Sequence, residues 1–186
     1  PQSKTYPEVW MLGTSNYGAQ LAAYLGIPYC FAHFITDGQG MKTAIDLYKS
    51  EFRPSKNFKK PLVNVCLWAL TAKTEEEAKY LFASRAAWKI GRNFGQLGPI
   101  TDPDNAINII HENNWQEQYE FMFKNSIVGE ISKTKEKIMS LVDDNNIDEI
   151  AILTWCHNEK ARIQSYELFA NEFNLNIKKT LQKTCL

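Results

Sequence analysis

The sequence predicts an α/β fold in which a parallel sheet is covered by helices. Two observations support this fold class: strand-like apolar runs alternate with segments of helical spacing, and the runs are apolar almost without interruption, as in sheets that are buried on both faces. These patterns leave an open sheet and a barrel equally possible. A whole (β/α)8 barrel needs about 250 residues, so about four strands in a chain of 186 residues amount to roughly half of one.

The first two strand–helix pairs lie in the first 52 residues. A strand is expected over 9–12, followed by a tight turn at 13–16 and by a helix that ends at Gly26. A second strand over 29–34 leads through a glycine-containing loop to a helix over 41–52, which has apolar residues on one face. The strand, turn and helix unit is therefore repeated.

The third pair has the clearest signals. A long apolar strand is expected over 62–70, and Thr74 is placed to cap the helix that follows. The three glutamates at 75–77 match the positive end of a helix dipole, so we interpret them as a helix start with a solvated face.

The segment 91–129 breaks this regularity with glycines, prolines and turns, and it is expected to be an insertion or lid within a single domain of residues 1–186. A helix that starts near Ser132, a strand over 149–155 and a final helix over 163–173 restore the alternation. The insertion carries Trp115, Tyr119, Phe121 and Phe123, which we interpret as packing residues rather than as the lining of a substrate entrance.

Composition excludes several function classes. With 21 basic and 21 acidic side chains, the chain lacks the positive field that nucleic acid binding requires. No apolar run long enough to cross a membrane and no secretory signal is present, which predicts a cytoplasmic protein without membrane contact. The four cysteines, Cys30, Cys66, Cys156 and Cys185, are widely spaced, so neither a metal site nor a disulfide framework is expected. Because the chain begins with Pro1 and not with methionine, we also expect it to lack an N-terminal part.

The turn from Gly13 to Gly18 is the strongest candidate site in the sequence. It leaves the end of a strand and opens a helix, so its backbone N–H groups, the helix dipole and the hydroxyls of Thr14 and Ser15 suit a phosphate group. Gly13 and Gly18 would let the backbone approach a ligand closely. The alternative is that Ser15 or Thr14 only caps the helix.

Several short motifs in this sequence resemble the luciferase-like flavin-dependent monooxygenases. They are Val9–Ser15, Ala19–Pro28, Phe31–Phe34, Ala44–Tyr48 with Phe52–Ser55, Thr74–Ala78, Asp148–Ile150 and Arg162–Leu168, in the family's order and at consistent spacing over most of the chain. The resemblance implies the C-terminal part of a TIM (β/α)8 barrel, whose first strand–helix units would be absent. It also implies an FMN-dependent or, less often, deazaflavin-dependent oxidation of a small organic substrate by reduced flavin and oxygen.

The same resemblance implies that the flavin phosphate lies near Thr14, Ser15 and Gly18, while a basic residue that meets it in the family belongs to the absent part. One departure stands at Val128–Ser132, where the family often has a Val-Gly-Thr-Pro-like turn. Because Glu130 occupies this turn, we expect it to disfavour an anion.

Three residues near strand ends are weaker candidates. His33 and His157 follow the second and last strands, at the rim where barrel enzymes place their chemistry, and His33 is retained as a candidate catalytic residue. Trp155 could form a wall beside the flavin ring. Ordinary packing accounts equally well for each histidine and better for Trp155.

The sequence leads to three hypotheses about function. The leading one is an FMN-dependent monooxygenase or related oxidoreductase, supplied with reduced flavin by a flavin reductase. The second is a non-catalytic flavin-binding or subunit-like protein, and the third is a truncated remnant. Since half of a barrel leaves sheet edges and an apolar inner face unpaired, we expect a homodimer or pairing with the missing half-barrel.

Overall fold

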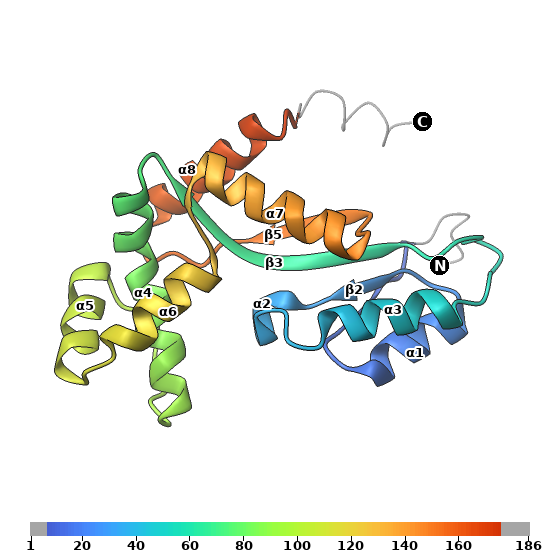
Figure 1. The fold of residues 1–186 in the computed structure, drawn as a ribbon, viewed down its shortest axis with the longest axis horizontal. Helices are drawn as coiled ribbons and strands as arrows, with labels where there is room; N and C mark the ends of the chain where they lie inside the picture. The colour runs from blue at the N-terminus through green and yellow to red at the C-terminus, as the bar shows by residue number, and fades with distance from the viewer. Residues whose placement is uncertain (1–6, 176–186) are drawn as a thin grey trace, which may run out of the picture. The chain divides into compact units, whose positions relative to one another are not determined.

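The computed structural model describes residues 7–175 and confirms the α/β fold, with five strands and eight helices in that range. Every strand pairing is parallel. The chain divides into two compact units, which share strand β3 (Val63–Ala72) and helix α7 (Ile131–Asn145) (Figure 1). Within the described residues, 7–68 and 140–153 form the first unit, and 69–139 and 154–175 form the second.

Four parallel strands make the sheet of the first unit. β1 (Met11–Gly13) pairs with β2 (Tyr29–Phe31), β2 pairs with the start of β3, and β3 pairs with β5 (Glu149–Leu153). The registers place Gly13 opposite Phe31 and Phe31 opposite Val65. The carboxyl ends of β1 and β2 therefore lie at the same edge of the sheet, where connections to helices begin.

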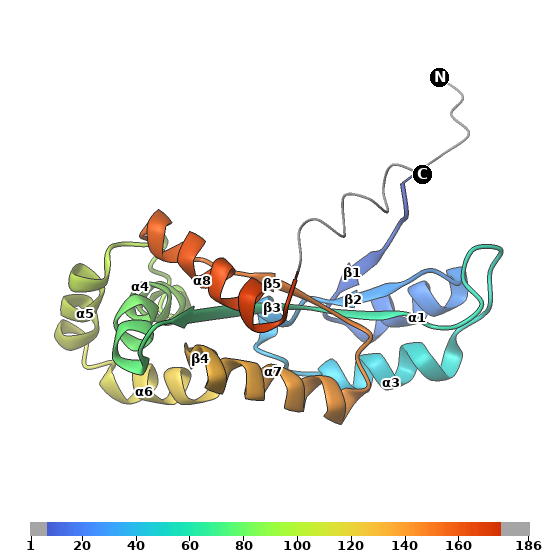
Figure 2. The same cartoon turned by 90° about the horizontal axis from the view of Figure 1, so that it is seen from above.

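Two helices pack together beside β1 and β2. α1 (Asn16–Leu25) buries small residues, including Ala19, Ala22 and Ala23, which allow the backbone of α3 (Met41–Glu51) to come close. A buried tyrosine, Tyr48, extends from α3, and its hydroxyl donates to the carbonyl of Ile27 and accepts from the amide of Leu62, directly before β3. The short helix α2 (His33–Thr36) connects β2 to this layer. Figure 2 shows α1 and α3 beside the strands of this unit.

The second unit is mainly helical. The last four residues of β3 pair with β4 (Ile127–Glu130), and the helices are α4 (Glu75–Asn93), α5 (Pro103–Glu112), α6 (Gln116–Asn125), the first part of α7, and α8 (Glu159–Glu172). Helix α4 begins where the sequence predicts, because the Thr74 hydroxyl accepts the amide of Glu77 at 3.1 Å.

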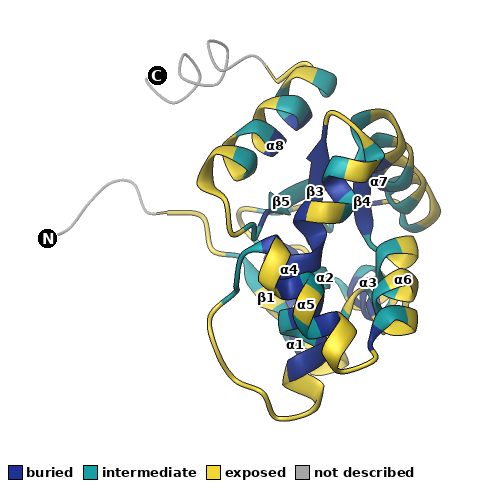
Figure 3. Cartoon of the chain, turned by 90° about the vertical axis from the view of Figure 1, so that its left-hand side faces the viewer, coloured by how far each residue is buried: buried dark blue, intermediate teal, exposed yellow. Residues whose placement is uncertain are grey.

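Helix α4 organises the core of this unit. It contacts α5, α6 and β4, and its alanines lie in a cluster of small and large apolar side chains: Ala83, Ala87, Ile90, Ala106, Ile110 and Trp115. Figure 3 shows buried residues along β3 and on the packed side of α4. The small residues of α4 let α5 pack closely against it.

The structure adds detail that the sequence did not predict. β4 is a fifth strand, two helices lie within the expected insertion at 91–129, β2 ends at Phe31, and β5 ends at Leu153. The lid role of 91–129 and the single domain stay predictions. Cys185 lies outside the described residues. Within residues 7–175 no helix is long and apolar enough to span a membrane.

Candidate functional site

The turn after β1 has the geometry that the sequence suggested. Ser15 adopts an extended backbone, with φ −112° and ψ 156°, and its hydroxyl oxygen accepts the amide of Gly18 at 3.3 Å. The amide of Ala19 donates to the Ser15 carbonyl at 3.2 Å. The cap role of Ser15 is therefore real, but it uses only one of the free amides of the first turn. The amides of Asn16 and Tyr17 occupy positions for which a helix offers no internal acceptor.

The two glycines of this turn face each other. A Cβ atom added at Gly13 would lie 4.0 Å from the Cα of Gly18, and one added at Gly18 would lie 3.8 Å from the Ser15 hydroxyl. Ser15, Asn16 and Tyr17 are exposed, whereas Gly18 is buried beneath them. The turn is therefore an accessible, compact surface of backbone and hydroxyl groups, as a small anion requires.

Strand β2 fixes the position of this turn. The carbonyl of Gly13 accepts from the amide of Ala32 at 3.0 Å and from the hydroxyl of Tyr29 at 3.3 Å. Burial, with the nearby Cys30 thiol as a smaller cause, raises the pKa of Tyr29 to about 12, so this donor stays protonated at neutral pH. Tyr29 on β2 and Ala32 directly after it thus hold the end of β1 in place.

His33 lies at the same edge of the sheet as the turn, at the start of α2. Its ring packs against Gly38, where an added Cβ would lie 2.7 Å from Nε2 and where φ is +85°. The structure therefore brings Gly13, Thr14, Ser15, Gly18 and His33 to one edge of the first unit. A catalytic role for His33 stays a prediction.

Trp155 and His157 belong to the second unit. The Trp155 ring meets that of Trp88 edge to face, with ring centroids 5.6 Å apart, a contact typical of packing. His157 is exposed. The charge of His157 acts on Asp102, but only as a smaller cause: two hydrogen bonds from Asn105 are the main reason that the pKa of the Asp102 carboxyl lies below its usual range.

The cysteines of the sheet are not activated. The Cys30 thiol donates to the side-chain oxygen of Asn64 at 3.1 Å, and burial, followed by the nearby Cys66, raises its pKa to about 11. Burial also raises the pKa of Cys66. Both groups therefore stay thiols at neutral pH, which does not suit a nucleophile or a metal ligand. Among residues 7–175, no cluster of three potential metal ligands is found.

The aromatic residues of the segment 91–129 mostly pack. Trp115 is buried, Tyr119 stacks on Phe82 with centroids 5.9 Å apart, and the Tyr119 hydroxyl donates to the carbonyl of Lys79 at 2.7 Å. Phe123 also contacts Phe82. Phe121 differs, because 69% of it is exposed.

One contact overturns the expectation at residues 128–132. Glu75 is not part of a wholly solvated face: its carboxylate accepts the amide of Glu130 at 3.0 Å and lies against Gly129. Lys133 lies 3.6 Å from the same carboxylate. The turn therefore does hold an anionic group, which the chain itself supplies. The sequence signal was the acidic residue directly after the Thr74 cap, but its partner lies 55 residues away.

Comparison with known proteins gives the family. The chain is 32% identical over 161 residues to a luciferase-like monooxygenase of Escherichia coli (strain K12), covering 86% of this chain and 48% of that protein. The crystal structure of apo-MsnO8 matches with a TM-score of 0.83 and 26% identity, over 95% of this chain and 54% of the other.

A third match shows the fold alone. The oxygenating constituent of 3,6-diketocamphane monooxygenase from Pseudomonas putida, in complex with FMN, has a TM-score of 0.58 and 19% identity, over 87% of this chain and 46% of that one. No model of a protein family matches the chain. The chain spans about half the length of the relatives it matches. By its sequence matches and its parallel α/β fold, the chain belongs to the luciferase-like monooxygenases and corresponds to the C-terminal portion of their barrel.

Proposed function

We propose that this chain is part of an FMN-dependent monooxygenase and that the turn from Gly13 to Gly18 binds the phosphate of the flavin. The observation that carries the proposal is the accessible helix start: Ser15 caps one amide, and the amides of Asn16 and Tyr17 face no acceptor within the helix. The FMN complex of a protein with the same fold supports FMN as the cofactor. A deazaflavin with a phosphate-bearing side chain would use the same contacts.

The residues of this chain bind and orient in the proposed function. Thr14 and Ser15 offer hydroxyls, and the dipole of α1 favours the negative charge of a phosphate. Bound reduced flavin supplies the oxygen activation, so the chain needs no strong acid or base of its own. We also propose that His33, at the same sheet edge, would hold a proton near a bound flavin or substrate.

Two further proposals concern the polypeptide as a whole. The substrate is a small organic molecule, and reduced flavin comes from a separate reductase. Strand β1 has one partner strand, β2, within the described residues, and Leu12 on β1 is 56% exposed. Pairing of this sheet with a second copy or with the other half of a barrel would cover such surface.

A second candidate function is flavin binding without turnover. The chain spans about half the length of its monooxygenase relative, so the groups described here are only some of those of a whole barrel. The two functions predict the same flavin affinity. They differ in oxygen consumption with reduced flavin and an apolar substrate, which only the enzyme produces.

The test separates phosphate binding from helix capping. FMN and riboflavin are titrated into the purified chain and followed by flavin fluorescence, with Ser15→Ala and Ser15→Asp as variants. Aspartate caps a helix as well as serine does, but its charge opposes a phosphate. We expect Ser15→Asp to keep the stability of the chain and to weaken FMN binding by at least about tenfold, with riboflavin affected much less.

The cap of α4 provides the matched control. Thr74→Ala removes an equivalent cap in the second unit, and it should lower stability without changing FMN affinity. If FMN and riboflavin bind equally well, or if Ser15→Asp binds FMN as tightly as the unmodified chain, the phosphate does not lie at this turn.

A further inference from the structure

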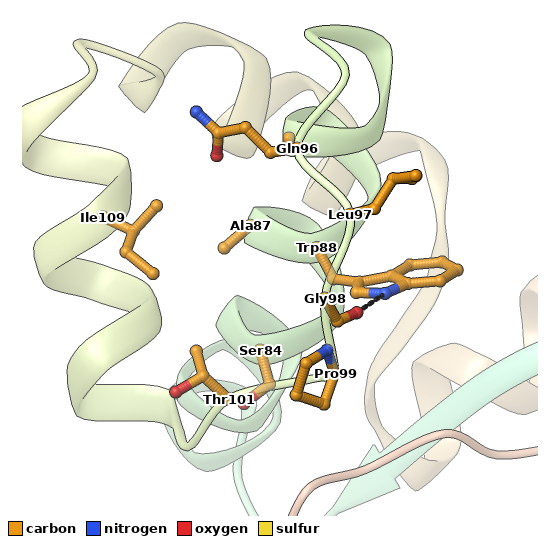
Figure 4. A pocket seen from close by; sticks show the side chains of 10 residues that line it. Ser84, Ala87, Trp88, Gln96, Leu97, Gly98, Pro99, Thr101 and Ile109 are labelled. Atoms are coloured by element: carbon orange, nitrogen blue, oxygen red, sulfur yellow. Dashed lines mark hydrogen bonds between the residues drawn. The ribbon is translucent and has the colours of Figure 1, made fainter.

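We propose that the second unit contains a binding site for a small neutral molecule, mainly apolar and with one oxygen, in the pocket between α4, α5 and residues 96–101. The pocket has a volume of about 200 Å³. Figure 4 shows its walls: Ser84, Ala87 and Trp88 on α4, Ile109 on α5, and the connection from Gln96 to Thr101 across the front. This site does not depend on the proposed flavin function.

The connection that forms the outer wall is fixed in two places. The amide of Gln96 donates to the carbonyl of Gly91 at 2.9 Å, and the indole N–H of Trp88 donates to the carbonyl of Gly98 at 2.9 Å. Gly91 also has a spatial role, because an added Cβ there would lie 3.1 Å from the side-chain oxygen of Gln96. One backbone hydrogen bond and one hydrogen bond from the Trp88 side chain thus hold the outer wall of the pocket in place.

Ser84 gives the pocket its specificity. It is 1% exposed, and its hydroxyl oxygen has no hydrogen-bond partner within the described residues. A buried hydroxyl without a partner destabilises a protein, so such a group calls for an external partner. An oxygen of a ligand at the Ser84 end of the pocket would supply it.

Size and charge define the ligand. None of the side chains that line the pocket is charged, so an ionic ligand would lose its hydration without gaining a counter-charge. A dry cavity of about 150 Å³ in another protein accepts benzene, so the present volume accommodates a six-membered ring with one substituent. A cyclic ketone or alcohol fits these requirements, with Ala87 and Ile109 against its ring.

The experiment uses two probes of the same shape. Cyclohexanone carries an oxygen that Ser84 can donate to, whereas methylenecyclohexane has a methylene group in its place. Binding is followed by NMR through the indole N–H signals of the chain, of which there are only five, one per tryptophan. Trp88→Phe assigns the signal at the pocket, and Trp10, in the first unit, serves as the internal control.

We expect cyclohexanone to shift the Trp88 signal in a saturable way and to leave the Trp10 signal unchanged. Ser84→Ala should weaken cyclohexanone binding by about three- to tenfold, the equivalent of one hydrogen bond, and should not weaken methylenecyclohexane binding. Ala87→Leu, which fills the pocket, should remove both. If this variant does not fold, the comparison of the two probes on Ser84→Ala still decides.

Three outcomes would overturn the proposal. They are the absence of saturable binding of cyclohexanone, an equal loss of both probes on Ser84→Ala, and a similar shift of all indole signals. Flavin affinity of the Gly13–Gly18 turn is measured separately, so failure at one site leaves the other unaffected.

Discussion

Asp148 and Val63 are joined by two hydrogen bonds, one donated by each residue. The carboxylate of Asp148 accepts the amide of Val63 at 2.8 Å, and the amide of Asp148 donates to the carbonyl of Val63 at 3.0 Å. The pair stands directly before the register in which Asn64 lies opposite Glu149. Two residues 85 positions apart therefore set the alignment of β3 with β5.

Replacing Asp148 with alanine should destabilise the sheet. The change leaves the amide of Val63 without its acceptor, so we expect the free energy of unfolding to fall by about 1–2 kcal/mol. Urea denaturation measures this. Asp148→Asn keeps an acceptor oxygen and should recover most of the loss. Equal losses for the two variants would mean that the hydrogen bond does not stabilise the strand.

Replacing Gly26 with alanine should lower the free energy of unfolding by more than the loss of the Asp148 carboxylate does. Gly26 ends α1 with φ +62°, and an added Cβ would collide with the carbonyl of Arg53 and lie 2.8 Å from Cβ of Ser55. Strain and collision together should lower stability by about 2–3 kcal/mol. Gly98→Ala is the control, because a Cβ there meets open space. Thermal unfolding of the two variants would contradict this view if their midpoints were the same.

The contact between Glu75 and Glu130 predicts that Glu75 stabilises the chain more than its neighbour Glu76 does. Glu75→Ala removes the acceptor of the Glu130 amide and should destabilise the second unit by about 1–2 kcal/mol. Glu76 is exposed in the same helical turn, so Glu76→Ala should change stability by less than about 0.5 kcal/mol. Guanidinium denaturation followed by tryptophan fluorescence compares the two. Similar losses would point to the dipole of α4 instead of the contact.

The Cys30 thiol predicts a loss of stability at high pH. Its pKa is raised from 9.0 to about 11 in the folded chain, mainly by burial, so between about pH 9 and 11 the unfolded chain loses a proton that the folded chain keeps. The free energy of unfolding should keep its full value below about pH 9 and should fall as the pH rises through this range. Cys30→Ser, whose hydroxyl does not titrate there, should flatten that part of the profile. An unchanged slope would show that another group causes it.

The same shift predicts slow modification of Cys30. At pH 8 the thiolate fraction is strongly reduced, so alkylation should be at least about tenfold slower than in the unfolded chain. Peptide mass spectrometry distinguishes Cys30 from the other cysteines. Labelling at the unfolded rate would mean that the thiol is not protected.

Local signals in the sequence were sufficient where one segment determines its own structure. The sequence predicts Thr74 as a cap and offers Ser15 or Thr14 as an alternative cap of the first helix, because a cap is recognised from a few neighbouring residues. In the structure Thr74 accepts the amide of Glu77 and Ser15 accepts the amide of Gly18. The apolar run at 62–70 marked β3 for the same reason. The first part of β3 pairs with β2, which pairs with β1, so β3 helps to position the candidate phosphate turn.

Features that depend on distant partners were missed. β4 has only four residues, one of them Gly129, and it forms a strand because it pairs in parallel with β3. α5 carried a signal that was not used, since Asp102 precedes Pro103 and accepts the amide of Asn105. Ser84 gave no signal at all, because its burial arises from the packing of its helix in the fold.

β3 changes partners along its length: residues 64–68 pair with β5 and residues 69–72 pair with β4. The change falls between Trp68 and Ala69, where the two compact units also divide. We therefore expect this single continuous strand to take part in two separate opening reactions. Amide hydrogen exchange along it should give two levels of protection with a step at this point, so that one strand reports the local stability of each unit.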